Sequence, residues 1–254
     1  MLTVDALKHI FPDTRRLAPK KRSSYSTNDI IPRNVIIVGS QSSVKTGTAR
    51  FLAEIAVTWY GKDNVNIAYS KGSIEPLFSA IRNKLVNILI CDDITLNKQS
   101  LESLQKFFQV RHVIEEMTGR TNGLVVTILI THRLYGIENP ELRASVDLFI
   151  FMSSPRGFDK TATTQIIGKS GVALLENLDE LKAEKDEDKS WGVCAYGRNI
   201  GLFYSKFAAT DYLGKGINPK NQRNWWKILK IAVVAIFTFL ILNMLLKRRR
   251  KIKL

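Results

Sequence analysis

Short apolar runs alternate with amphipathic stretches along the middle of the chain. The runs that we expect to form strands contain few polar residues and lie at residues 35–38, 65–69, 87–92, 124–131 and 146–151. The stretches that we expect to form helices lie between them, at residues 45–59, 73–84 and 98–117. Unbroken apolar strands are typical of a parallel sheet that is covered on both faces. The pattern therefore predicts a three-layer α/β domain with a mainly parallel sheet, in which ligands bind at the carboxyl ends of the strands.

The part of the chain that follows residue 151 has a different pattern. The sequence VALLENLDELKAEKDEDKS, residues 172–190, indicates a helix that ends in a charged run. The sequence WGVCAYGRNIGLFYSKF, residues 191–207, indicates a hairpin of two short strands. We expect this hairpin to extend the sheet at one edge.

The two ends of the chain differ from the middle in charge. The formal net charge of the chain is +15. Residues 1–33 have seven basic and three acidic residues, giving +4, and residues 215–254 have eleven basic residues and no acidic one, giving +11. Residues 34–214 are neutral overall, so composition does not require a basic DNA-binding face on this domain. We expect residues 1–33 to form a solvated basic arm, and an arm that contacts DNA or lipid headgroups is the alternative.

The C-terminal part of the chain is expected to cross a membrane. Residues 231–246 are apolar except for Asn243, and the stretch 225–246 would span about 33 Å as a helix, enough for a hydrocarbon core of about 30 Å. Trp225 and Trp226 fit the aromatic belt of a membrane interface. Residues 215–224 are then a basic linker and residues 247–254 a basic tail, and a buried core helix is the alternative. The two cysteines, Cys91 and Cys194, favour a reducing compartment over a disulfide framework.

A loop between the first predicted strand and the first predicted helix is similar to a phosphate-binding loop. Its residues are Gly39, Ser40, Gln41, Ser42, Ser43, Val44, Lys45 and Thr46. Backbone N–H groups of such a loop and of the following helix bind phosphate oxygens. Lys45 would contact the β- and γ-phosphates of ATP, and the Thr46 hydroxyl would bind Mg²⁺. Val44 departs from the GxxxxGK[ST] pattern, which has its second glycine there, and a strand–turn–helix with an incidental lysine is the alternative.

Two acidic residues follow the third predicted strand in the sequence VNILICDD. An acidic residue at the end of a buried strand is the Walker B pattern, so Asp92 would hold Mg²⁺ through water. Asp93 would orient or deprotonate the attacking water as a catalytic residue, although many motors have glutamate there. The alternative is an exposed acidic turn. Signals of a GTPase are missing, because NKQS at residues 97–100 lacks the aspartate of NKxD and no DxxG follows the acidic pair.

The order of these motifs is that of the RecA-like ATPases, in which a polar sensor ends the strand after the Walker B strand. The sequence THRLYGIENPELRASVDLFIF, residues 131–151, makes the resemblance more specific. It resembles the FtsK–HerA superfamily of DNA-pumping ATPases, which includes genome-packaging ATPases of double-stranded DNA viruses. The resemblance covers residues 34–151 and implies that Thr131 or His132 senses the γ-phosphate. It also implies that Arg143 acts on the ATP of a neighbouring subunit, with Arg111 as a second candidate, and a surface ion pair is the alternative for each arginine.

Taken together, these features predict an oligomeric ATPase that requires ATP and Mg²⁺ and acts on double-stranded DNA. We expect it to form a ring of identical subunits that is anchored in a lipid membrane. The domain at residues 34–214 would lie in the cytoplasm and the single span at residues 225–246 in the bilayer. Two alternatives stay open: an assembly or secretion ATPase similar to the zonular occludens toxin-like proteins of filamentous phages, and a nucleotide-binding membrane adaptor that does not hydrolyse ATP.

Overall fold

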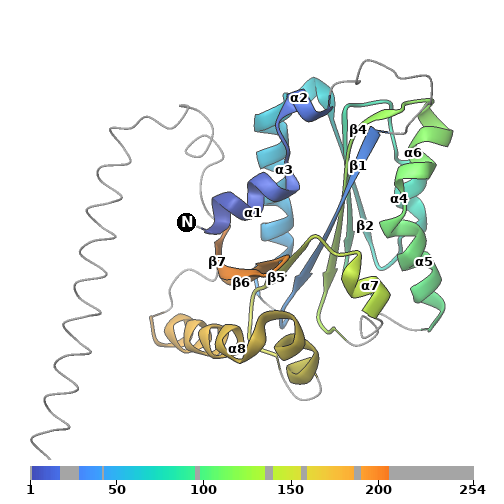
Figure 1. The fold of residues 1–254 in the computed structure, drawn as a ribbon. Coiled ribbons are helices and arrows are strands. Elements are labelled where there is room, and N and C mark those ends of the chain that lie inside the picture. The colour runs from blue at the N-terminus through green and yellow to red at the C-terminus, as the bar shows by residue number, and fades with distance from the viewer. Residues whose placement is uncertain are drawn as a thin grey trace, which may run out of the picture. The chain divides into compact units, whose positions relative to one another are not determined.

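The computed structural model describes residues 2–17, 29–41, 43–94, 98–134, 140–155, 159–185 and 190–205 (Figure 1). All of them belong to one compact unit, residues 1–209. The predicted linker at 215–224, span at 225–246 and tail at 247–254 lie outside the described residues. Within the described ranges, none of the helices combines the length and the apolar character needed to cross a bilayer.

Seven strands of the described chain form one sheet, in the order β2-β3-β4-β1-β5-β6-β7. Their bounds are β1 Asp29–Val38, β2 Val65–Lys71, β3 Val86–Asp92, β4 Asn122–Thr131, β5 Leu148–Phe151, β6 Trp191–Tyr196 and β7 Asn199–Tyr204. The first five strands in the order, β2 to β5, are parallel, and the hairpin β6–β7 is antiparallel to β5. The predicted mainly parallel sheet and the hairpin at its edge are both confirmed.

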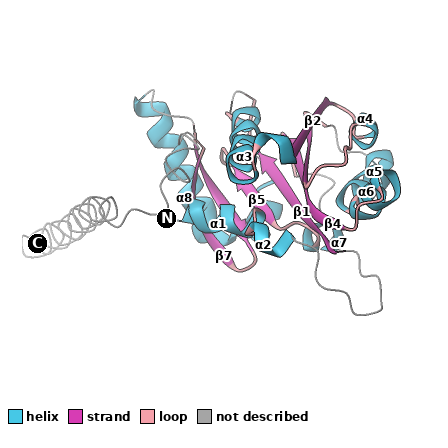
Figure 2. Cartoon of the chain, turned by 90° about the horizontal axis from the view of Figure 1, so that it is seen from above, coloured by secondary structure: helices cyan, strands magenta, loops and turns pink. Residues whose placement is uncertain are grey.

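Helices cover both faces of the sheet, and Figures 1 and 2 show the strands between α3 and the α5–α6 pair. The helices are α1 Leu2–Ile10, α2 Thr14–Leu17, α3 Lys45–Tyr60, α4 Glu75–Ser79, α5 Lys98–Phe108, α6 Arg111–Thr118, α7 Pro140–Ala144 and α8 Asp159–Lys185, with a 3₁₀ turn at Lys62–Asn64. One apolar core lies between the sheet and the helices α4 to α8. The helices α1, α2 and α3 pack on other parts of the sheet. Because β1 to β5 are parallel, their carboxyl ends lie together at one edge of the sheet.

Two predicted helices are shorter in the structure than in the prediction. The stretch 73–84 is helical only in α4, because the Asn87 side chain bonds the backbone N–H and C=O of Arg82 and holds a turn there. The stretch 98–117 is two helices, α5 and α6, separated by a turn at Gln109 and Val110. The two short helices still connect the ends of β3 and β4, so the topology is unchanged.

The N-terminal region differs from the solvated arm expected for residues 1–33. Ala6, Leu7 and Ile10 recur at helical spacing and are buried. Phe11 packs edge-on against Trp59 and Tyr60 of α3, and the Tyr60 hydroxyl donates to the Pro12 carbonyl at 2.6 Å. Strand β1 begins within this region too, so residues 2–17 and 29–33 pack as part of the domain, and residues 18–28 lie outside the described residues.

Candidate nucleotide-binding site

The loop between β1 and α3 lies at the carboxyl end of the central strand β1 (Figure 1). The Ser43 hydroxyl donates to the Ser40 carbonyl at 2.8 Å, which draws the loop into a tight turn. The Ser40 N–H donates to the Ser153 hydroxyl at 2.7 Å, so the segment after β5 supports the loop. Gln41 is exposed at the turn, and Ser42 lies outside the described residues. The first turn of α3 has no side-chain cap, which leaves a helix N-terminus that favours anions.

Lys45 is buried and lies folded over this loop, with an exposed fraction of 6%. Its ammonium donates to the carbonyls of Gly39 at 2.9 Å and Ser40 at 2.6 Å, and it lies 3.2 Å from the Nδ1 atom of His132. Burial lowers the pKa of the Lys45 ammonium, and the charges of Asp92 and Asp93 partly oppose this. Polyphosphate binding would replace contacts with neutral carbonyls by contacts with charged oxygens, which are stronger.

Val44 stands where the phosphate-binding pattern has glycine, and the structure accommodates it. Its backbone has φ −70° and ψ 43°, so this position does not need the left-handed conformation that favours glycine. The side chain extends over the first turn of α3, where its Cγ1 atom would be only 2.6 Å from a Cβ atom added at Gly47. The missing side chain at Gly47 thus makes room for the branched side chain at Val44.

The Asp92 carboxylate at the end of β3 is bound by two hydroxyl groups. The Thr46 hydroxyl at the start of α3 donates to Oδ2 of Asp92 at 2.8 Å. The Tyr69 hydroxyl of β2 donates to the same oxygen at 2.9 Å. A hydroxyl and a carboxylate side by side are hard oxygen donors of the kind that Mg²⁺ binds.

The described residues fit a magnesium site that is completed by a nucleotide. No group of three or more His, Cys, Asp or Glu side chains in the described ranges could hold a metal ion by itself. Mg²⁺ in nucleotide sites typically keeps several waters and takes one or two protein ligands together with the phosphates. Thr46 would supply one direct ligand and Asp92 would hold the ion through a water, and the bound ion would neutralise charge on the phosphates.

Asp93 follows Asp92 with a backbone φ of 59°, which is the left-handed region that few residues other than glycine adopt. Aspartate tolerates this conformation better than most residues, and strained positions of this kind are frequent at functional sites. The turn exposes the carboxylate. Its oxygens lie 3.0 Å from Nε2 of His132 and 3.7 Å from the Lys71 ammonium.

His132 connects the loop with the acidic pair. Strand β4 lies between β1 and β3 in the sheet, so the residue that follows β4 is adjacent to the ends of both. One ring nitrogen of His132 faces Lys45 and the other faces Asp93. Thr131 instead uses its buried hydroxyl locally, since it donates to the Arg133 carbonyl at 2.9 Å. Of the two predicted sensor residues, His132 is the one that the fold brings into contact with the site.

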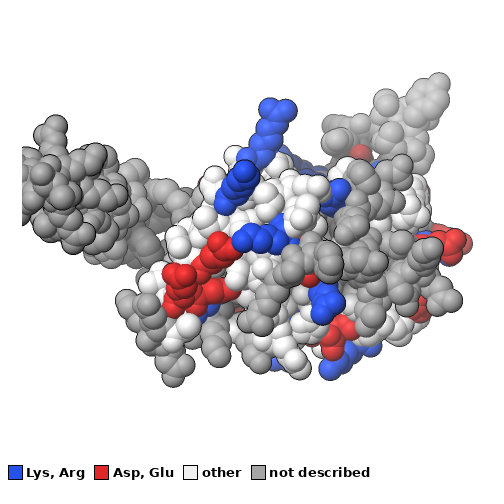
Figure 3. All heavy atoms as spheres, turned by 90° about the horizontal axis from the view of Figure 1, so that it is seen from below, with Lys and Arg blue, Asp and Glu red and all other residues white. Residues whose placement is uncertain are grey.

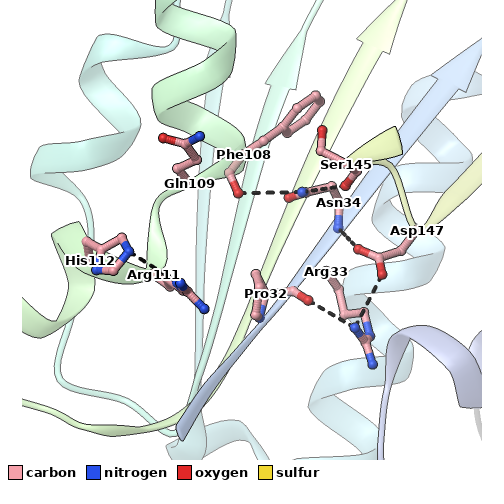
Figure 4. Close-up of a pocket in the computed structure, with 9 residues that line it drawn as sticks. All are labelled: Pro32, Arg33, Asn34, Phe108, Gln109, Arg111, His112, Ser145 and Asp147. Atoms are coloured by element: carbon pink, nitrogen blue, oxygen red, sulfur yellow. Dashed lines mark hydrogen bonds and ion pairs between the residues drawn. The ribbon is translucent and has the colours of Figure 1, made fainter. Parts of the chain in front are cut away.

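The two predicted arginines lie on other parts of the domain. Arg143 is on α7, where its guanidinium donates to the Gln165 side chain of α8. Arg111 lines a pocket together with Asn34 and Asp147 (Figure 4). Asn34 precedes Gly39 by five residues of an extended strand, which places this pocket about 17 Å from the loop. A role for either arginine on a neighbouring subunit's ATP concerns a second chain and stays a prediction.

Figure 3 views the edge of the sheet at which the parallel strands end, with acidic and basic side chains interspersed over the described surface. Neither sign covers this face among the described residues. The view agrees with the neutral overall charge of residues 34–214. General electrostatic attraction therefore gives this surface no strong preference for a polyanion.

Sequence reasoning did not single out three side chains of the site: Tyr69 and Lys71 of β2, and Ser153 after β5. Tyr69 and Lys71 lie on the edge strand, and their contacts with the acidic pair depend on the register of β2 against β3. Ser153 contacts the loop through the adjacency of β5 and β1. No local sequence motif predicts a role for these three positions.

Solved structures of ATPases are similar to this chain. The genome packaging NTPase B204 from Sulfolobus turreted icosahedral virus 2, in complex with AMPPCP, is 13% identical with a TM-score of 0.42, covering 69% of this chain and 98% of that chain. The DNA-packaging ATPase B204 from Sulfolobus turreted icosahedral virus is 12% identical with a TM-score of 0.43, covering 72% of this chain and 100% of that chain. EssC (ATPases 2 and 3) from Geobacillus thermodenitrificans is 12% identical with a TM-score of 0.38, covering 69% of this chain and 40% of that chain.

No protein-family model matches the chain, and no curated protein matches it. Viral genome-packaging ATPases, the group that the sequence motifs resemble, are thus among the solved proteins that this chain resembles in structure.

Proposed function

We propose that this protein is an oligomeric P-loop ATPase that binds MgATP at the loop between β1 and α3 and hydrolyses it to move double-stranded DNA. The observation that carries the ATPase proposal is the convergence of Lys45, Asp93 and His132 at the ends of three parallel strands. Thr46 and Asp92 adjoin them and provide the oxygen donors for Mg²⁺. The strand order supports the RecA-like assignment, because the strand that bears the sensor lies next to both motif strands.

The side chains have complementary roles in this proposal. Lys45 leaves the loop carbonyls and binds the β- and γ-phosphates, together with the uncapped N–H groups of α3. Asp93 orients the attacking water and accepts its proton. His132 senses the γ-phosphate and acts on Asp93 through the contact between the two side chains. Arg143 of a neighbouring subunit stabilises charge on the transferring phosphoryl group.

The DNA substrate and the membrane anchor rest on the sequence alone. Movement of DNA follows from the resemblance of residues 34–151 to the FtsK–HerA superfamily. Anchoring follows from the apolar run at residues 231–246 within the predicted span 225–246, which would hold the ATPase domain at the cytoplasmic side of a membrane. The basic segments at both ends would then bind DNA or anionic headgroups.

The test is steady-state ATP hydrolysis by the purified full-length chain, with and without duplex DNA. We expect turnover that requires Mg²⁺ and rises when duplex DNA is added. Turnover that DNA leaves unchanged would contradict the DNA motor and favour the phage assembly or secretion ATPase. Binding of ATP without turnover would contradict both and favour the membrane adaptor.

A further inference from the structure

The edge strand β2 contributes a hydroxyl group to the predicted magnesium site. Tyr69 pairs with Ile90 in the register of β2 and β3, and its side chain extends along the sheet to Asp92, two residues further on. Its hydroxyl donates to Oδ2 of Asp92 at 2.9 Å.

Packing does not account for the position of this tyrosine. The Tyr69 residue is 54% exposed, so it is not part of the core, where a tyrosine would be mostly covered. Ile67, two residues earlier on the same face of the strand, is exposed as well. The hydroxyl contact with Asp92 is thus the specific interaction of this side chain.

The contact has a consequence for the geometry of Asp92. Thr46 and Tyr69 both donate to Oδ2, and within the described ranges no side chain donates to Oδ1. Two donors that approach one oxygen from different elements fix the plane of the carboxylate. The second oxygen then points in a constant direction, because hydrogen bonds to a metal-binding carboxylate fix its orientation.

We propose that Tyr69 is a positioning residue of the magnesium site, whose hydroxyl orients the Asp92 carboxylate toward a water on the Mg²⁺ of MgATP. This inference rests on the proposed function, because it requires MgATP at the loop between β1 and α3. Tyr69 does not touch the nucleotide, so it acts on affinity only when the metal ion is present.

The test compares nucleotide affinity with and without metal in full-length Tyr69→Phe and wild-type protein. Affinity for ATP is measured by calorimetry in excess Mg²⁺ and in excess EDTA. We expect Tyr69→Phe to weaken binding about tenfold in Mg²⁺, as is usual when an outer-shell partner of a metal site is removed, and to leave binding in EDTA unchanged. Tyr196→Phe, a change at a tyrosine of β6 whose ring packs at a tilt against His9, is the matched control and should behave like wild type.

Three results would overturn the inference or its basis, and they are distinguishable. Equal affinity of wild type and Tyr69→Phe in Mg²⁺ would mean that the hydroxyl does not position Asp92, while the proposed function would stand. Equal weakening in Mg²⁺ and in EDTA would mean that Tyr69 contacts the nucleotide itself. Wild-type protein that binds ATP no better in Mg²⁺ than in EDTA would contradict the proposed function.

Discussion

The absence of a side chain at Gly47 leaves room for the branched side chain of Val44. A phosphate-binding loop of the common pattern has glycine at position 44 and no restriction at position 47. This chain has the branched residue first and the glycine three positions later, one helical turn on, where the two face each other. The first turn of α3 thus accommodates this departure from the pattern.

A double-mutant cycle tests this pairing. Gly47→Ala alone places a Cβ atom 2.6 Å from Val44 Cγ1, and overpacking of this kind typically costs about 1–3 kcal/mol. Val44→Gly combined with Gly47→Ala removes the clash and should recover most of the loss. Urea unfolding and ATP affinity of the four proteins provide the measurement. Additive effects of the two changes would contradict the pairing.

The two acidic residues should respond differently to loss of charge. Asparagine adopts the left-handed conformation of Asp93 readily, so Asp93→Asn keeps the turn and removes only the basic carboxylate. We expect ATP binding to be retained and the hydrolysis rate to fall about a hundredfold or more. Asp92→Asn should instead raise the Mg²⁺ concentration needed for half-maximal activity. Similar mild effects at both positions in a Mg²⁺ titration would count against these roles.

The residues of the site differ in whether the sequence alone predicts their role. The loop at 39–46 and the acidic pair at 92–93 could be predicted because each motif is contiguous. Tyr69 could not, because its contact with Asp92 is created by the register of two strands. The role of Gly47 was also hidden, since a glycine in a helix has no local meaning until the direction of the Val44 side chain is known.

At the scale of elements, strand positions were predictable because burial on both faces leaves apolar runs. The order of the strands was not, since adjacency of β1 to β4 and β5 depends on crossovers that the local pattern does not encode. The helix α1 was missed because the basic residues that follow it dominated the composition of residues 1–33. Its apolar face is short, with Ala6, Leu7 and Ile10 as its buried residues.

The docking of α1 should make stability depend on pH through His9. Burial lowers the pKa of His9 below 6.5, the Arg33 charge lowers it further, and Asp147 partly opposes this. The folded state therefore prefers the neutral ring. Above the unfolded pKa neither state is protonated, and as the pH falls through it the unfolded chain binds the proton first. Stability should thus decline between about pH 7.5 and pH 5.5.

Urea unfolding of wild type and His9→Gln at both pH values measures this contribution. The decline should be smaller in His9→Gln than in wild type. The matched control is His112→Gln, which removes an exposed histidine of α6 and should keep the wild-type decline. The same decline in all three proteins would show that His9 does not carry the effect.

At the scale of the whole molecule, the proposed motor requires more than one copy of the chain. Arg143→Ala should be inactive alone, because the neighbouring ATP would lack its arginine. Mixing it with Lys45→Ala should restore part of the activity, since an intact loop would then meet an intact arginine. Arg111→Ala, the change at the second candidate arginine, is measured alone and in the same mixtures for comparison. Failure to restore activity at any mixing ratio would argue that Arg143 acts within its own chain or supports α7 against α8.

Charge distribution limits where a polyanion would bind. The surplus of basic residues lies at residues 1–33 and 215–254, while the domain between them is neutral. The nucleotide site therefore does not depend on a general positive field, and its affinity for phosphate must come from Lys45 and the start of α3. Lys45 is therefore the side chain whose loss should affect phosphate binding most.

The most direct measurement is the rate of ATP hydrolysis by full-length wild type and Lys45→Ala, at saturating Mg²⁺ and with circular dichroism to verify folding. Lys106→Ala, which removes an exposed lysine of α5, is the control. We predict measurable turnover for wild type and the control. The rate for Lys45→Ala should be lower by a factor of about a hundred or more. Turnover by folded Lys45→Ala at the wild-type rate would contradict the assignment of the loop as the site of ATP hydrolysis.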